Sequence, residues 1–329
     1  MNKSGYYFSG MKALYNLKVL HRGYPLALRW MLTDSCDNRC RYCTLWQNPR
    51  KMMPLDDIKN ILDQVKKAGT IRISYSGGEP LLRNDITEIL SYTRSLGITC
   101  SMNTNGSLIA KRKKAVEKLD LVKISLDGMQ ESHDKLSGRV GAYGQAIEGI
   151  EKCRQWNIPV IITTTITKHN ISQVDNILEL ARRYEILVAF QPFKIMYKGS
   201  KEQGLCPSGE EYRNVILKLI DLKKNKYPYL RNSLTSLYHI LDYPEFPRMK
   251  CAAGKLFSII DVDGTLLPCD RNDGQIKGSL RNVREGYLEV FRSLPEYDCT
   301  GCGFLGGREL TYFANFIFEG MSSIKKVIK

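Results

Sequence analysis

The sequence predicts an α/β protein built on a partial (β/α)6 barrel of the TIM type. Between Leu26 and Tyr197, short apolar runs alternate with segments of helical period. The apolar runs have the character of buried strands, and parallel strands need crossover helices, so this alternation predicts a parallel sheet with helices outside it. Six units are fewer than the eight of a closed barrel, and we therefore expect an open one.

The elements of this barrel can be placed by their residue ranges. The predicted strands are 26–33, 70–78, 98–104, 121–127, 159–167 and 187–193, and the predicted helices are 55–68, 85–96, 109–118, 143–155 and 171–184. The helix over 55–68 has the clearest signal, because its apolar residues share one face and Gly69 follows its last turn.

The pattern divides the chain into four segments. A basic and aromatic extension covers 1–25, the barrel 26–197, a connecting helical segment 198–248, and a small C-terminal domain 249–329. We expect an amphipathic helix around 209–224. The stretch "CAAGKLFSIIDVDGTLLPC" predicts a β-hairpin that turns at Asp263 and Gly264.

Composition restricts the partners and the location. With 329 residues and 43 % hydrophobic content, the chain can bury a large core. Its net charge of +15 attracts anions, which could be acidic small molecules, phosphorylated substrates, lipid headgroups or RNA. Ten cysteines are too few for a disulfide scaffold, so we expect reduced thiols and a cytoplasmic protein. No apolar run approaches the ~20 residues of a transmembrane helix.

Three cysteines follow the first predicted strand, in "TDSCDNRCRYCTLW". Cys36, Cys40 and Cys43 thus lie where a parallel barrel carries its chemistry. Thiolates favour soft metals, and iron–sulfur cubanes normally take four of them, so three leave one iron open to another ligand. A zinc knuckle or coincidence is the alternative, although no histidine or further cysteine follows within fifty residues.

The spacing C-x3-C-x2-C, with the aromatic Tyr42 before the last cysteine, resembles that of the radical S-adenosylmethionine (radical SAM) enzymes. The resemblance implies a 4Fe–4S cluster whose open iron is chelated by the amino and carboxylate groups of SAM. An electron from the cluster would cleave the sulfonium and give a 5′-deoxyadenosyl radical that abstracts a substrate hydrogen. The resemblance covers roughly residues 25–195.

Further segments resemble the same family and imply cofactor-binding residues. In "SGGEP", Gly77 and Gly78 would allow close backbone approach, and Glu79, before Pro80, would receive the ammonium group of SAM together with a freed carbonyl. "NTNG" would offer amide hydrogen bonds from Asn103. The remaining candidates are Ser125 and Asp127 of "ISLDG" for the ribose hydroxyls and Arg139 for the methionine carboxylate, with a structural cap or ion pair as the alternative for each.

A second group of cysteines lies near the C-terminus: Cys251, Cys269, Cys299 and Cys302. Taken alone, four thiols in this pattern fit a structural zinc site. Downstream of a radical SAM domain they resemble the twitch and SPASM extensions. Because no cysteine follows Cys302, the shorter twitch type is favoured, with one auxiliary 4Fe–4S cluster held by all four. A closed cluster suits electron transfer, whereas a missing ligand would permit substrate binding.

The other cysteines give weaker signals. Cys100 and Cys153 fit buried packing positions. Cys206 lies in a polar loop and is a weak candidate for a proton or hydrogen-atom donor at the barrel mouth, with an ordinary loop cysteine as the alternative. His133 lies beside a cofactor-like motif, but we do not expect it to be a catalyst.

Both ends of the chain mix aromatic and aliphatic residues with Lys and Arg. Such segments can lie on an anionic bilayer surface, which would give peripheral membrane contact. The alternative is that both ends dock against the barrel and seal its open bottom or side.

The resemblance therefore implies a radical SAM enzyme with the auxiliary cluster as electron acceptor, and the positive net charge favours an anionic small molecule as the substrate that it oxidises or otherwise modifies. A reductant such as flavodoxin or ferredoxin is implied. One alternative is a peptide- or protein-modifying maturase. Another is an RNA-modifying enzyme, which basic stretches such as "KKNKYPYLR" suggest, although nucleic acid is not the preferred partner. A third alternative, from a different class of protein, is a non-catalytic interaction protein that binds zinc or an iron–sulfur cluster.

Overall fold

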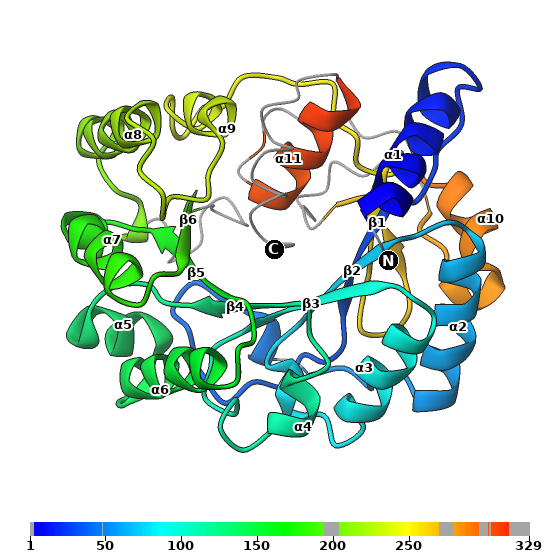
Figure 1. Cartoon of the computed structure of the whole chain (residues 1–329), viewed down its shortest axis with the longest axis horizontal. Coiled ribbons are helices and arrows are strands. Elements are labelled where there is room, and N and C mark those ends of the chain that lie inside the picture. The colour runs from blue at the N-terminus through cyan, green and yellow to red at the C-terminus, as the bar shows by residue number, and fades with distance from the viewer. Residues whose placement is uncertain are drawn as a thin grey trace.

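One curved sheet of eight strands organises the molecule (Figure 1). The computed structural model describes residues 3–47, 49–193, 204–269, 279–295, 302 and 304–315, with side chains from Gly5 onward. The strand order is β6-β5-β4-β3-β2-β1-β7-β8. The strands are β1 (Ala27–Met31), β2 (Arg72–Ser76), β3 (Thr99–Thr104), β4 (Leu121–Ser125), β5 (Val160–Ile166), β6 (Leu187–Pro192), β7 (Phe257–Ile260) and β8 (Leu266–Leu267).

The first six strands confirm the predicted partial barrel. Each pairs in parallel with its neighbours in chain order, for example Ala27 with Arg72 and Asn103 with Lys123. All six ranges lie inside the predicted ones. Parallel strands bring all their carboxyl ends to the same edge of the sheet, and the loops that carry the candidate site residues follow these ends.

The C-terminal hairpin continues this sheet. β7 and β8 pair antiparallel, as predicted, and Gly264 lies between them with a φ of +94°, a conformation that glycine adopts without strain. β7 also pairs in parallel with β1, with Ala27 opposite Phe257. The hairpin of the 249–329 segment is therefore part of the barrel sheet and lies beside the strand that leads into the cysteine loop.

Helices cover the convex face of the sheet (Figure 1). They are α2 (Leu55–Lys67), α3 (Ile86–Ser95), α4 (Lys113–Val116), α5 (Gln130–Ser137), α6 (Ala142–Gln155) and α7 (Val174–Arg183), with short 3-10 turns at Leu45–Gln47, Pro80–Leu82, Ile171–Gln173 and Val283–Glu285. The apolar face of α2 is buried as predicted. The helix predicted at 109–118 is shorter than expected, because tight turns from Leu108 to Arg112 precede α4.

The described parts of the two ends of the chain lie on the open side of the barrel. In Figure 1, α11 (Leu305–Ala314) lies opposite the curved sheet, between α9 (Leu234–His239) and α1 (Lys3–Lys18). Ala13 of α1 and Ala314 of α11 are buried in one cluster with Leu26 and Phe257. Docking against the barrel, one of the two alternatives for the ends, is what the described parts of both ends do. α8 (Gly209–Lys224) and α10 (Tyr287–Arg292) complete the fold.

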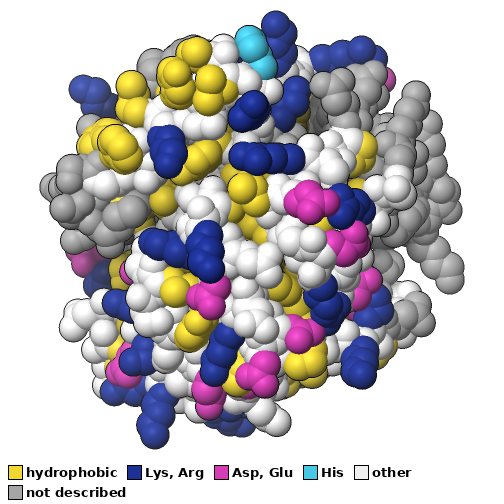
Figure 2. Space-filling view, turned by 90° about the vertical axis from the view of Figure 1, so that its right-hand side faces the viewer, with side chains coloured by type: hydrophobic (Ala, Val, Ile, Leu, Met, Phe, Trp, Pro, Cys, Tyr) yellow, Lys and Arg dark blue, Asp and Glu magenta, His cyan; other side chains and the backbone are white. Residues whose placement is uncertain are grey.

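The exposed face of α1 is apolar as well as basic. Tyr7, Phe8, Met11 and Tyr15 are each half exposed or more. Figure 2 shows hydrophobic side chains beside Lys and Arg on the side of the molecule that carries this helix. In the described ranges, no helix has the length and apolar character needed to cross a bilayer. Peripheral membrane contact stays a prediction.

Candidate active site

The three cysteines of the first group lie in the loop between β1 and the turn at Leu45–Gln47, and all three line one cavity. The amide of Cys43 donates to the carbonyl of Cys40 (3.1 Å), which folds the C-x2-C part into a turn. The amide of Asn38 donates to Sγ of Cys36 (3.4 Å). The cavity is about 1650 Å³ in volume.

Asp37 anchors this loop to the ends of other strands. Its carboxylate accepts hydrogen bonds from Nδ2 of Asn105 (2.7 Å), Oγ of Ser107 (2.7 Å) and the guanidinium of Arg139. Burial alone would raise the pKa of Asp37, but these three donors lower it below its ordinary value. The carboxylate therefore stays ionised and ties Cys36 to the loop after β3.

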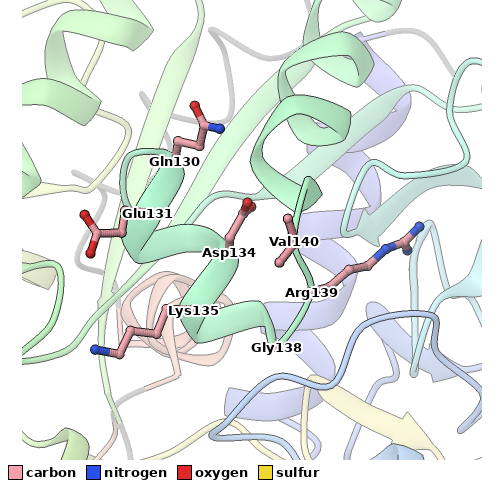
Figure 3. Close-up of a pocket in the computed structure, with 7 residues that line it drawn as sticks. All are labelled: Gln130, Glu131, Asp134, Lys135, Gly138, Arg139 and Val140. Atoms are coloured by element: carbon pink, nitrogen blue, oxygen red, sulfur yellow. The ribbon is translucent and has the colours of Figure 1, made fainter.

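Arg139 is thus placed differently from the prediction for a carboxylate-binding residue. Its guanidinium is paired with Asp37, and Arg139 is not among the residues that line the cavity of the cysteines. In Figure 3 its side chain points away from Asp134 and Lys135, which line a separate, shallow pocket with it. Contact between Arg139 and the SAM carboxylate stays a prediction. It would require Arg139 to bind Asp37 and SAM at once or to leave Asp37.

Burial and neighbouring groups act on the pKa values of the cysteine thiols. Burial raises the pKa of Cys36 to about 11, and neighbouring Asp37 and Cys43 add to the shift. Burial also raises the pKa of Cys40, with further increases from Cys43 and Cys36, so the three groups lie close enough to influence one another. Iron binds thiolates, and loading would therefore displace protons from these sulfurs.

The thiols are not arranged around a single ion. Among the residues that the structure describes, no three His, Cys, Asp or Glu side chains surround one metal position. A cubane cluster needs a different arrangement of thiolates, because each thiolate binds a separate iron. Three cysteines on a loop that opens into a cavity fit that requirement.

Gly77 and Gly78 lie against the backbone of the cysteine loop. The amide of Gly78 donates to the carbonyl of Thr33 (2.6 Å), and the amide of Glu79 to that of Ser35 (2.8 Å). A Cβ atom at Gly78 would lie 2.2 Å from the carbonyl oxygen of Ser35, well inside contact distance. The glycines therefore allow the close approach of two protein segments, in addition to any approach to a cofactor.

Glu79 is fully buried behind this contact. Its carboxylate accepts from the amides of Leu81 (3.1 Å) and Asn105 (2.8 Å) and from Oγ1 of Thr104 (2.9 Å). Burial raises its pKa to about 7 against the effect of these donors. A carboxylate offers about four acceptor positions, so three donors leave about one. Glu79 is not among the residues that line the cavity of the cysteines, and its contact with an ammonium group stays a prediction. Pro80 begins the 3-10 turn directly after it.

Asp127 follows β4 and is held by two partners. It accepts from the hydroxyl of Tyr42 and from the amide of Thr165 (2.7 Å), and burial raises its pKa to about 6. The aromatic residue of the cysteine loop thus contacts the "ISLDG" segment directly. Ser125 and Asn103 line the same cavity, and Nδ2 of Asn103 donates to Ser74 (3.4 Å).

His133 is a cavity residue whose role the sequence does not predict. Its Nδ1 accepts from the amide of Asp127 (2.9 Å), so the proton of the neutral ring is on Nε2. Burial lowers the pKa of His133 to about 4, which keeps the ring neutral near pH 7. A local signal exists, since His133 lies in the first turn of α5, six positions after Asp127, but it does not reveal this hydrogen bond.

The second group of cysteines is only partly described. Cys251 and Cys302 both lie beside α11: Thr311 contacts Sγ of Cys251 at 3.9 Å, and Arg308 donates to the carbonyl of Cys302 (3.0 Å). Cys269 is buried, and Cys299 lies outside the described residues. A common site for these four cysteines stays a prediction.

Cys206 is placed near the cysteine loop but not in the cavity lining. It packs with Leu136, Phe193 and Leu205 in a small cluster that also contains Tyr42. Burial raises the pKa of Tyr243, and a hydrogen bond with Cys206 raises it further. The role of Cys206 as a proton or hydrogen-atom donor stays a prediction.

Replacing Gly78 with alanine tests the contact between the two segments. We expect Gly78→Ala to displace the cysteine loop and to lower iron incorporation severalfold, because the added methyl group would overlap a backbone oxygen that cannot rotate away. The matched control is Gly144→Ala on α6, where a Cβ meets nothing within 4 Å. Iron and sulfide analysis after reconstitution checks both variants. Full iron content in Gly78→Ala would refute the contact's importance.

An open parallel barrel with a three-cysteine loop at the carboxyl edge of its strands fits an enzyme whose iron–sulfur cluster has one open iron. Residues 30–181 match the family model described as the radical SAM superfamily. This part of the chain is a radical SAM domain, and the protein is an enzyme. The family implies a 4Fe–4S cluster and SAM as cofactors.

Two curated relatives and one solved structure illustrate the similarity. The AdoMet-dependent heme synthase of Methanosarcina barkeri (strain Fusaro / DSM 804) is 26 % identical over 85 % of this chain and 88 % of its own length. The Fe-coproporphyrin III synthase of the same organism is 31 % identical, over 57 % of this chain and only 49 % of its own length. Streptococcus suis SuiB bound to its precursor peptide SuiA has a similar fold, with a TM-score of 0.68 and 20 % identity over 86 % and 68 % of the chains.

Proposed function

We propose that this protein reductively cleaves SAM and uses the resulting 5′-deoxyadenosyl radical to abstract a hydrogen atom from an anionic small molecule. The observation that carries the proposal is that the cysteine loop, the Gly77–Gly78 turn and the end of β4 at Ser125 all line one cavity. A cavity shared by these three segments gives the cluster, the cofactor and the substrate a common space at the carboxyl edge of the barrel.

The residues of the site take separate roles in this proposal. Cys36, Cys40 and Cys43 would hold the cluster, which supplies the electron that cleaves the sulfonium when SAM is bound. Glu79 fixes the ends of β2 and β3 against each other and offers its remaining acceptor position to the ammonium group. Ser125, Asn103 and the carboxylate of Asp127 would contact the ribose and adenine parts of SAM. Tyr42 keeps Asp127 oriented.

The substrate is proposed to be small and anionic on two grounds. The net charge of +15 raises the local concentration of anions. Three relatives that cover 85 %, 87 % and 87 % of this chain are named AdoMet-dependent heme synthase, and heme is a small molecule. A relative named PqqA peptide cyclase covers 86 % of this chain, and peptide modification is therefore the second candidate. Oxidation of the substrate radical, with a flavodoxin- or ferredoxin-like reductant for the first step, would suit a cytoplasmic protein with reduced thiols.

An auxiliary 4Fe–4S cluster in a twitch-like segment is the proposed electron acceptor. Cys251, Cys269, Cys299 and Cys302 would hold it, and the positions of Cys251 and Cys302 beside the same helix support a shared site. Because β7 pairs with β1, such a cluster would lie on the part of the sheet that joins the barrel.

Metal analysis of the anaerobically reconstituted protein tests this proposal. We expect about eight irons and about eight sulfides per chain, since each cubane contributes four of both. About four irons with one zinc would contradict the auxiliary cluster while leaving the radical SAM cluster in place.

A further inference from the structure

Four basic side chains, three arginines and one lysine, line the inside of the barrel, in the same cavity as the three cysteines. They come from separate elements: Arg29 from β1, Arg72 from β2, Lys123 from β4 and Arg231 from the segment that follows α8. The amide of Arg231 donates to the carbonyl of Val188 (2.8 Å), which holds this segment against the start of β6.

The strand period explains how these cations reach the interior. Successive residues of a strand point to opposite faces, so Arg72, Ser74 and Ser76 share one face of β2, while Ile73 and Tyr75 share the other. Ile73 and Tyr75 are buried in the core, and the first three residues line the cavity. On β4, Lys123 and Ser125 alternate in the same way with buried apolar residues.

Two of these side chains donate hydrogen bonds to serine hydroxyls of β2. Nζ of Lys123 donates to Oγ of Ser74 (3.0 Å), and Nη2 of Arg29 donates to Oγ of Ser76 (3.0 Å). Across the described ranges, neither Arg72 nor Lys123 nor Arg231 forms an ion pair within 4 Å, and Nε of Arg231 is buried with no hydrogen-bond partner there.

The cations also influence one another. Burial lowers the pKa of Lys123 well below its ordinary value, and the charges of Arg231, Arg72 and Arg29 lower it further. Glu309 of α11 is the acid that acts on Arg231, whose pKa is nevertheless lowered to about 10 by burial and by Arg72. Oε1 of Glu309 already accepts from Ser233 (2.8 Å).

Buried like charges are costly in a folded protein, and a ligand that brings negative charge offsets this cost. Three acids, Asp120, Asp127 and Glu309, also line the cavity, but in the described ranges none of them lies within 4 Å of a charged nitrogen of Arg72, Lys123 or Arg231. The cavity has room for one. Its volume of about 1650 Å³ exceeds the ~300–1,000 Å³ of an ordinary small-molecule site. SAM and a second molecule can therefore occupy it together.

The position of the cations sets the length of that second molecule. Arg72 begins β2, and Gly77 follows its last residue, so about 16 Å of strand separates the arginine from the turn beside the cysteine loop. Aromatic side chains, among them Phe257 and Phe304, line the same cavity, and the guanidinium of Arg29 lies 5.6 Å from the ring centre of Phe304. Such a lining suits an apolar body with charged arms.

We propose that Arg72, Lys123 and Arg231 bind two or more carboxylate or phosphate groups of the substrate and hold its charged end deep in the barrel, away from the three cysteines. The inference deepens the proposed function and rests on it. Arginine binds either anion through two parallel hydrogen bonds. Two arginines and a lysine that line one cavity therefore offer more donors than the roughly four acceptor positions of a single carboxylate.

We call Arg72, Lys123 and Arg231 the cation clamp. Calorimetric titration of the full, reconstituted chain with chosen probes tests whether the cation clamp binds anions. Saturating SAM is present throughout, so that a probe cannot enter the site of the SAM carboxylate. The probes are benzene-1,3,5-tricarboxylate, its one-carboxylate counterpart benzoate, and fructose 1,6-bisphosphate. We expect the tricarboxylate or the bisphosphate to bind at least tenfold more tightly than benzoate, and the better of the two identifies the anion.

Variants test whether the basic side chains of the cavity are responsible for that binding. Arg72→Gln and Arg231→Gln should each weaken it about tenfold or more, as expected for loss of a charge-assisted pair. The control Arg154→Gln removes the same charge from an exposed arginine of α6 and should leave binding unchanged. Glu309→Gln should tighten binding severalfold, a gain that misfolding cannot produce.

The outcomes separate this inference from the proposed function. Equal binding by all variants, or no preference for the multiply charged probes over benzoate, would overturn the cation clamp even if SAM is cleaved normally. Conversely, failure of the wild-type protein to cleave SAM would overturn the proposed function while leaving the probe titrations valid.

Discussion

Replacing Cys36, Cys40 and Cys43 together with alanine is expected to abolish 5′-deoxyadenosine formation and to remove about four of the eight irons expected per chain. The three thiols line the cavity together, and each would bind one corner of the cluster that donates the electron. Without that cluster no electron reaches the sulfonium. The four irons that remain would belong to the C-terminal cysteines.

The control for this variant is Cys153→Ala, which removes a buried thiol from α6 on the outer side of the sheet. Iron content and SAM cleavage should stay at the wild-type level. Chromatographic assay of 5′-deoxyadenosine, with metal analysis of the same samples, measures both effects. Residual SAM cleavage by the triple variant would contradict the assignment of these three cysteines.

Glu79→Ala is expected to have the second largest effect, a loss of stability of about 3 kcal/mol or more together with a large loss of SAM affinity. The substitution leaves the amides of Leu81 and Asn105 and the hydroxyl of Thr104 without their acceptor in a buried position. The ends of β2 and β3 would then separate, and the Gly77–Gly78 turn would lose its support.

Glu79→Gln provides the comparison. The glutamine side chain keeps the size of glutamate and one acceptor oxygen. Its NH₂ group, however, would face the hydroxyl of Thr104 and the amide of Asn105, which donate to the second carboxylate oxygen in the wild-type protein. We expect intermediate stability and weak SAM binding. Denaturant unfolding and SAM titration measure the two properties separately. Wild-type SAM affinity in Glu79→Gln would remove the carboxylate from the ammonium site and leave it a purely structural role.

Much of the barrel could be predicted, because its signals are local. The apolar face of α2 and the six short apolar runs are read from neighbouring residues, and the structure confirms both. The cysteine loop is equally local, since its three thiols lie within eight residues. A local spacing of this kind needs no knowledge of distant contacts.

The pairing of β7 with β1 could not be predicted in this way. More than 200 residues separate Ala27 from Phe257, and nothing in either segment specifies the other as its neighbour. The hairpin itself was predictable from the Asp263–Gly264 turn, but its attachment to the barrel depends on which sheet edge remains open after the first six strands have paired.

The charged interior had a sequence signal that was easy to miss. In "RISYS" and "LVKIS", polar residues alternate with apolar ones at a period of two. The apolar members pack under the helices, and the polar members therefore face the interior. Reading these strands as buried on both sides conceals Arg72 and Lys123, whereas the alternation itself predicts a polar cavity.

The local roles of Gly78 and Glu79 were also hidden. Both residues were expected to serve SAM directly, but the structure gives each a protein partner: the cysteine loop for Gly78, and the end of β3 for Glu79. Motif residues can thus organise a site as well as touch its ligand. Only the three-dimensional contacts separate these two roles.

The most direct test of the central claim is the formation of 5′-deoxyadenosine by the wild-type protein. The anaerobically reconstituted chain is incubated with SAM and a strong one-electron reductant, and the product is measured by chromatography and mass spectrometry. We predict 5′-deoxyadenosine in the reduced sample and none without reductant. A protein with its full iron content that produces none under reduction would contradict the account.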